Sequence, residues 1–301
     1  RVYLDLMLKL RELCVRHGKR MNMWADIAMK HPQMLPDMPK DICLCNWDYG
    51  PEGHRIKRTG ELAEHGLAFA CCTGVGGWAS HGSRLHLAIK NVANFAAAGR
   101  EHGAEGLMHT DWGNMGHRNY LGTSLCSMAH GAAHGWCSEN VEDAKHIRRF
   151  TDLVFGDPEG KLAKGLSRMG ESPLGIMQAP YMAILEQLTE PKPLPNSGHI
   201  WDGFRVDRNM QISRPNLTNR KIAARAEAVR SIAWPRPTRK LGEFEALAME
   251  EFEGAAFMEA VGCDRMNLGR DLRAGRSVAP AALEGHAGAL LQCAEDHQRL
   301  W

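Results

Sequence analysis

The chain has 301 residues, of which 44% are hydrophobic, so it is long enough for one large domain or two ordinary ones. Its 37 basic and 35 acidic residues leave a net charge of +2, which gives no case for nucleic acid or an anionic membrane as a partner. Its apolar runs fall short of the roughly 20 residues of a membrane span, so we expect no membrane association.

The first part of the chain alternates between predicted helices and predicted strands. Apolar residues at helical spacing predict a first helix over residues 3–17, which ends at Gly18. Apolar runs predict four strands, over residues 21–27, 41–47, 67–73 and 107–112. Helical segments are expected between and after them, over residues 60–65, 84–102 and 124–136. Such alternation over short loops is typical of a parallel sheet.

The pattern changes after about residue 138, where the predicted elements become helical. Helices are predicted over residues 141–155, 160–169, 219–234, 241–260 and 281–300, with a basic loop over residues 272–277. A stretch near 173–215 is rich in Pro, Gly and Asn and predicts a linker. We therefore predict two parts: residues 1–138 contain the sheet, and residues 139–301 form a helical region.

Aromatic or polar side chains lie at or just after the C-terminal end of each predicted strand. The pairs are Trp24 and Asp26, Trp47 and Tyr49, Thr73 and Trp78, and Asp111 and Trp112. The carboxyl ends of parallel strands meet at one edge, where (β/α)8 barrels carry their active sites. Because a whole barrel needs eight strands, the four predicted strands indicate half of one.

The stretch GAEGLMHTDWGNMGHRNY, residues 103–120, ends an apolar run in polar and aromatic residues. A pyranose has apolar C–H faces and a rim of hydroxyls, and an indole offers a large rigid apolar face with one N–H donor. Carboxylates and amides bind the hydroxyl rim. We interpret Trp112 as a wall of a sugar-binding pocket. Packing in the core is the alternative for this tryptophan and for Trp24, Trp47 and Trp78.

Several segments resemble the C-terminal half of the catalytic barrel of family 20 glycoside hydrolases, the β-N-acetylhexosaminidases. They are GKRMNMWADI, ICLCNWDY, the glycine-rich turn before Trp78, and EGLMHTDWGNMGH. The resemblance covers about residues 1–136 and, more loosely, the helical region. It implies an α/β fold of the (β/α)8 TIM-barrel type, with only the last four strands present, followed by an α-helical C-terminal region. Trp24 and Trp112 match the tryptophans that line the family's N-acetyl sugar pocket.

Two positions depart from the family pattern. The family has a carboxylate two residues after the last pocket tryptophan, whereas this chain has Asn114, whose amide bonds a hydroxyl but carries no charge. The family also holds the acetamido carbonyl with a tyrosine at the end of the seventh strand. The corresponding CCTGVGGW has no tyrosine, which leaves Tyr49 or Thr73 as the substitute.

The resemblance implies hydrolysis of terminal N-acetylglucosamine or N-acetylgalactosamine with substrate assistance and retention of configuration. The family's catalytic Asp-Glu pair ends the fourth strand, so we expect it upstream of Arg1 and expect these residues alone to be inactive. The residues that we expect to bind substrate are Trp24, Asp26, Trp47, Tyr49, Trp78, Asp111, Trp112 and Asn114. No cofactor and no metal are expected.

Other functions stay open at this point. One is a non-catalytic carbohydrate-binding remnant. Another is a metal-dependent hydrolase on the same barrel that uses His109, Asp111 and His117, because His109 and Asp111 would share a strand face. The helical region offers a surface for a homo-oligomer. The nine cysteines include no CxxC pair and lie mostly in apolar runs, which favours buried reduced thiols and a cytoplasmic location.

Overall fold

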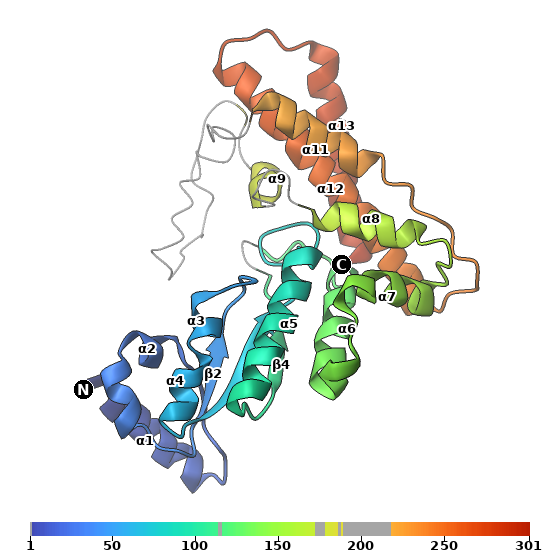
Figure 1. The fold of residues 1–301 in the computed structure, drawn as a ribbon. Helices are drawn as coiled ribbons and strands as arrows, with labels where there is room; N and C mark the ends of the chain where they lie inside the picture. The colour runs from blue at the N-terminus through green and yellow to red at the C-terminus, as the bar shows by residue number, and fades with distance from the viewer. Residues whose placement is uncertain (1, 114–115, 172–177, 186–187, 189–217) are drawn as a thin grey trace. The chain divides into compact units, whose positions relative to one another are not determined.

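The structure, a computed structural model, describes residues 2–113, 116–171, 178–185, 188 and 218–301, and it is α/β. Two compact units can be distinguished along the chain drawn in Figure 1. The sheet unit comprises Arg1–Gly76, His86–Asp111 and Ser127–His146, and the helical unit comprises Gly77–Leu85, Trp112–Cys126 and Ile147–Trp301. The chain passes between these two units several times. The sequence predicts a single division near residue 138, and that division stays a prediction.

Four parallel strands form the sheet, in the order β1-β2-β3-β4. They are β1 Asn22–Trp24, β2 Cys43–Trp47, β3 Ala68–Gly74 and β4 Leu107–Thr110. The predicted parallel sheet is therefore confirmed, although β1 and β4 end earlier than predicted. β1 ends at Trp24 because Asp26 begins a helix, where an acidic side chain is favoured by the partial positive charge of the helix N-terminus.

Helices and 3-10 turns connect the strands and follow the last one. They are α1 Val2–Arg16, α2 Asp26–Lys30, η1 Pro32–Asp37, α3 His54–Lys57, α4 Thr59–Glu64, α5 Leu85–His102, α6 Gly122–Cys137, η2 Ser138–Asn140 and η3 Asp143–Lys145. The predicted first helix is confirmed as α1, and Gly18 follows its end with a φ of 63°, a value that glycine adopts without strain.

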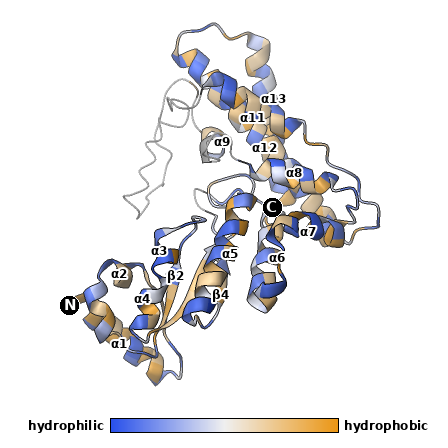
Figure 2. Cartoon of the chain, in the orientation of Figure 1, coloured by the Kyte–Doolittle hydropathy of each residue, from blue (hydrophilic) through white to orange (hydrophobic). Residues whose placement is uncertain are grey.

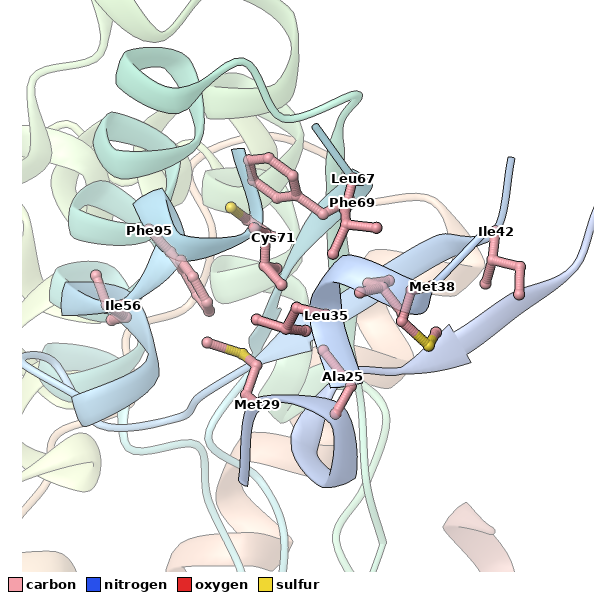
Figure 3. Close-up of a cluster of buried hydrophobic side chains, with 13 residues drawn as sticks. Ala25, Met29, Leu35, Met38, Ile42, Ile56, Leu67, Phe69, Cys71 and Phe95 are labelled. Atoms are coloured by element: carbon pink, nitrogen blue, oxygen red, sulfur yellow. The ribbon is translucent and has the colours of Figure 1, made fainter. Parts of the chain in front are cut away.

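The core of the sheet unit lies on one face of the sheet. Leu44, Phe69 and Cys71 alternate inward along β2 and β3 and are almost fully buried. Met29 from α2 and Phe95 from α5 pack against them, as Figure 3 shows. The connecting helices therefore cover this face, as expected for helices that link parallel strands.

The opposite face of the sheet carries a different set of side chains. Alternation along the strands directs Trp24, Cys45, Trp47, Cys72 and Met108 to this face. Trp24 and Met108 are each more than a third exposed. Figure 2 shows that the strands are coloured mostly as hydrophobic, whereas the helices alternate between hydrophobic and hydrophilic segments.

The helical unit is built around one long helix. Its helices are α7 His146–Phe155, α8 Lys161–Gly170, α9 Gln178–Ala183, α11 Asn219–Arg230, α12 Glu243–Arg273 and α13 Pro280–Leu300. α12 packs against α9, α11 and α13. An ion pair between Arg225 of α11 and Glu259 of α12 is almost fully buried, with 3.1 Å between Nε and Oε1.

Three helix boundaries differ from the prediction. The helix predicted from residue 141 begins at His146, after two 3-10 turns, and the one predicted to residue 234 ends at Arg230. α12 continues past residue 260 to Arg273, so the loop predicted from residue 272 begins later. The linker predicted near 173–215 lies mostly outside the described residues. Among the helices of the described residues, none combines the length and apolar character that crossing a membrane requires.

Candidate functional site

The C-terminal edge of the sheet carries two of the predicted tryptophans on one face. Trp24 is the last residue of β1, and Trp47 is the last residue of β2. Trp24 pairs with Cys45, two residues before Trp47, so the two indoles belong to adjacent strands and share a face. The strand spacing and the rise per residue place their Cα atoms roughly 8 Å apart. The sheet therefore offers two aromatic side chains at one edge.

The indole of Trp47 has charged and aromatic neighbours. The Arg55 guanidinium lies over the ring, 4.0 Å from its centroid, and donates a hydrogen bond of 3.1 Å to the Trp47 carbonyl. The Tyr49 ring lies 5.2 Å from the Trp47 ring, centroid to centroid, at an interplanar angle of 33°. Arg55 therefore covers one face of the indole, and the Tyr49 ring lies beside it.

The loop after β2 is held by a carboxylate and an amide. Asp48 accepts hydrogen bonds from the backbone N–H groups of Gly50 and Arg55, at 3.0 and 3.1 Å. Asn91 of α5 donates to the carbonyls of Asp48 and Gly50, at 2.8 and 2.9 Å. These bonds fix the backbone on both sides of Tyr49, so the position of its ring beside Trp47 is defined by the loop.

The two predicted aspartates lie at the same edge but outside the strands. Asp26 begins α2 and is half-buried. Asp111 is exposed and directly follows β4, which ends at Thr110. Both carboxylates follow the ends of the observed strands, whereas the predicted strands included them, and Asp111 is exposed to solvent.

The remaining predicted residues belong to the helical unit or lie outside the described residues. Trp78 is half-buried, and Trp112 is 40% exposed. Arg84 lies over the Trp78 ring, 4.8 Å from its centroid. Asn114 is outside the described residues. Trp24 and Trp47 are thus brought together within one unit, whereas Trp78 and Trp112 are placed in the other.

His109 and Thr73 have a structural role on the helix-covered face of the sheet. The Nδ1 atom of His109 lies 2.7 Å from the Thr73 hydroxyl, and its Nε2 atom lies 3.2 Å from the Ser127 hydroxyl. Burial lowers the pKa of His109 to about 4. Both ring nitrogens have hydroxyl partners, and Asp111 lies beyond the strand. The structure therefore gives no support to a metal site at His109 and Asp111. Because the Thr73 side chain lies on the helix-covered face, Tyr49 is the remaining substitute for the family's tyrosine.

All nine cysteines are free, which agrees with the prediction of reduced thiols. Two of them, Cys45 and Cys72, lie on the face of the sheet that carries Trp47, and both are buried. A hydrogen bond from the Cys72 thiol lowers the pKa of Cys45 to about 7, and the same bond together with burial raises the pKa of Cys72. The thiols of Cys45 and Cys72 therefore interact with each other on this face.

One cluster was not predicted from the sequence. His130 and His134 lie one turn apart on α6, and their Nε2 atoms lie 2.7 and 2.9 Å from Oδ1 of Asp143 in η3. Among the described residues, this is the group of His, Cys, Asp or Glu side chains close enough to share a metal ion, with ligand atoms within 4.8 Å of one another. The spacing HGAAH, with histidines at i and i+4, was the available signal.

Burial and hydrogen bonding set the protonation of this cluster. Burial lowers the pKa of His130 to about 4, which outweighs the opposing effect of its bond to Asp143. Burial would raise the pKa of Asp143, but hydrogen bonds from His134 and His130 outweigh it and lower that pKa. The Nδ1 atom of His134 lies 2.6 Å from the Ser138 hydroxyl. A neutral imidazole and a carboxylate therefore face each other at pH 7.

No protein-family model matches the chain, and no curated protein matches it significantly.

Proposed function

We propose that this chain is the sugar-binding half of a β-N-acetylhexosaminidase-like glycoside hydrolase, on a (β/α)8 barrel of which the four strands are the last four. The observation that carries the proposal is the pair of indoles, Trp24 and Trp47, at the carboxyl ends of adjacent parallel strands. They lie on the face opposite the helix-packed core, which is the face that lines the interior of such a barrel.

The residues at this edge suit an aminosugar. An indole face stacks on the apolar C–H face of a pyranose, and the exposed indole of Trp24 is the proposed stacking surface. Trp47, with one face covered by Arg55, is the proposed neighbouring wall. The Tyr49 hydroxyl is the proposed donor to the acetamido carbonyl, replacing the family's tyrosine. Asp111 is the proposed acceptor for sugar hydroxyls, since its carboxylate is exposed just beyond β4.

The other predicted site residues enter the proposal through the resemblance. Trp112 is the proposed wall of the N-acetyl pocket, Trp78 contributes a further aromatic surface, and Asn114 bonds a hydroxyl in place of the family's carboxylate. Asp26 holds a hydroxyl or the neighbouring loop.

The proposed reaction needs a proton donor, which in the family is the glutamic acid of an Asp-Glu pair. In substrate-assisted hydrolysis the acetamido oxygen attacks the anomeric carbon, a glutamic acid protonates the leaving oxygen, and the adjacent aspartate orients the acetamido group. The 301 residues contain no Asp-Glu dipeptide, and the resemblance places that pair before Arg1. We therefore propose that this chain binds the sugar and that hydrolysis needs the preceding strands. The free thiols favour a cytoplasmic location.

Binding without hydrolysis is the second candidate, and the missing Asp-Glu dipeptide is the observation that favours it. An assay with a chromogenic N-acetyl-β-glucosaminide separates the two candidates when it compares this chain with a longer protein that also carries the preceding strands. Hydrolysis by the longer protein, with rates unchanged by a chelator, supports the enzyme. Sugar binding by both proteins without hydrolysis by either supports the binding module, and no binding by either contradicts both.

A further inference from the structure

We infer that His130, His134 and Asp143 bind a divalent transition-metal ion, for which Zn²⁺ is the best match. The two Nε2 atoms and Oδ1 converge on one point from two segments of the chain, α6 and η3. Imidazole and carboxylate are ligands that Zn²⁺ accepts, and three protein ligands leave a fourth tetrahedral position for water. The inference is independent of the proposed sugar site, because none of these residues lies at the C-terminal edge of the sheet.

The two contacts to Asp143 need only a small adjustment to admit the ion. Bonds of about 2.0 Å in a tetrahedral site separate neighbouring ligand atoms by roughly 3.3 Å. The contacts of 2.7 and 2.9 Å to Asp143 therefore open by about half an ångström on binding. Asp143 can make that movement because it lies on a short 3-10 turn and its side chain is 42% exposed. The same exposure gives the ion a path from solvent.

The surroundings of the ligands also suit a metal. The side chain of His130 is fully buried and that of His134 is 5% exposed, so their rings have few alternative positions. The Ser138 hydroxyl contacts Nδ1 of His134 at 2.6 Å and so orients that ring, as the outer partner of a metal-bound histidine does. His146 adds a further imidazole beside the site, with its ring centroid 4.6 Å from that of His130.

The site lacks the general base of the zinc hydrolases, although its fourth position is open to water. Zinc hydrolases that take two ligands from one helix at this spacing carry a glutamate as general base between the histidines, whereas Gly131, Ala132 and Ala133 stand between them here. The ion joins α6 to η3 and so fixes the turns that lead into α7. Metal binding is therefore expected to stabilise this part of the sheet unit.

Cobalt titration tests the site directly. The 301-residue chain, freed of metal with EDTA and kept reduced, is titrated with Co²⁺ while the visible d–d absorption of low-symmetry cobalt is followed. We expect a single Co²⁺ per chain, displaced by Zn²⁺, without the near-ultraviolet thiolate-to-cobalt band that cysteine ligation would give. The last point matters because the chain has nine free thiols.

Matched variants locate the ion. Asp143→Asn changes one ligand atom and alters the side-chain volume little, and His134→Gln provides a second ligand variant. Each should weaken Co²⁺ binding by more than about 100-fold, and Ser138→Ala should weaken it by about 10- to 100-fold. His86→Gln, at an exposed position of α5, should leave it unchanged. An absent cobalt spectrum, a thiolate band, or equal binding by Asp143→Asn and the unaltered chain would overturn the inference.

Discussion

The buried ion pair of the helical unit gives a quantitative test of how that unit is held together. Arg225 donates to Glu259, and its guanidinium also donates to the carbonyls of Arg168 and Met169, at 2.9 Å each. Arg225 therefore joins α11, α12 and the end of α8. Replacing Arg225 with Met removes these bonds and leaves Glu259 buried without its cation, which should destabilise the helical unit by about 3–5 kcal/mol.

A double variant separates the cost of leaving the Glu259 carboxylate buried without a cation from the cost of lost packing. Replacing both Arg225 and Glu259 with Met removes the buried charge, so it should cost less than Arg225→Met alone. The remaining loss is the two unpaired carbonyls, about 1–3 kcal/mol each at most. Hydrogen exchange of the α11 and α12 amides measures the effect, because it reports the opening of these helices rather than that of the whole chain.

The pH dependence of the single variant has a defined sign. Burial raises the pKa of Glu259 above its ordinary value, while the charge of Arg225 opposes the rise. Without Arg225 the folded carboxyl binds a proton more tightly than the unfolded one, so stability falls as the pH rises above the unfolded pKa. The deficit of Arg225→Met should therefore be smaller near pH 5 than near pH 8. A pH-independent deficit, or a double variant no more stable than the single one, would refute the account of a stranded charge.

Three further predictions concern smaller features. Gly131→Ala should destabilise the sheet unit by about 1–3 kcal/mol in urea unfolding, because a Cβ there would lie 2.7 Å from the ring of His109. Gly135→Ala, on the same helix, should instead stabilise it by about 0.5–1 kcal/mol, because a Cβ there would have no atom within 4 Å. Burial lowers the pKa of His109 and His130 to about 4, so stability present above pH 6.5 should be lost as the pH falls toward 4, and His130→Gln should reduce the loss. Asp157→Ala should cost about 1–2 kcal/mol and expose the first turn of α8 to hydrogen exchange, since its carboxylate accepts two backbone N–H groups there.

The short elements around the sheet were predictable because their signals are local. The apolar runs over residues 21–27 and 41–47 predicted β1 and β2, and their alternation with helices predicted the parallel sheet. The placement of these tryptophans at one edge followed from that topology. Whether each indole faces the helices or the opposite side depends on register, which the structure supplies.

The predictions that were wrong concern residues whose environment is set by contacts between distant parts of the chain. The helix predicted over residues 241–260 continues as α12 through Gly262. A Cβ at 262 would collide with the backbone of Pro180, so the glycine permits close packing of α9. Glu251 stands in a glutamate-rich stretch of this helix, yet it is buried and accepts a hydrogen bond from the Gly122 N–H at 2.5 Å. Local periodicity carries no information on partners so distant in sequence.

The sequence analysis predicted neither the start of α7 at His146 nor the cluster of His130, His134 and Asp143. A helix was predicted from residue 141, whereas the segment around Asp143 forms 3-10 turns. The carboxylate of Asp143, in the turn η3, contacts His130 and His134 of α6. The helical pattern from residue 141 gave no sign of this contact. The His-x3-His spacing was visible in the sequence, but the third ligand became apparent only from the fold.

The central claim is that Trp24 and Trp47 bind the face of an N-acetylhexosamine. Calorimetric titration of this chain with N-acetylglucosamine tests it most directly, with Trp24→Ala and Trp47→Ala compared with Trp136→Ala, whose indole is 93% exposed on α6. We predict that the unaltered chain binds the sugar and that each of the first two variants weakens binding about tenfold or more, or about 1.4 kcal/mol, while Trp136→Ala has no effect. Absence of binding, or equal affinity in all four proteins, would contradict the claim.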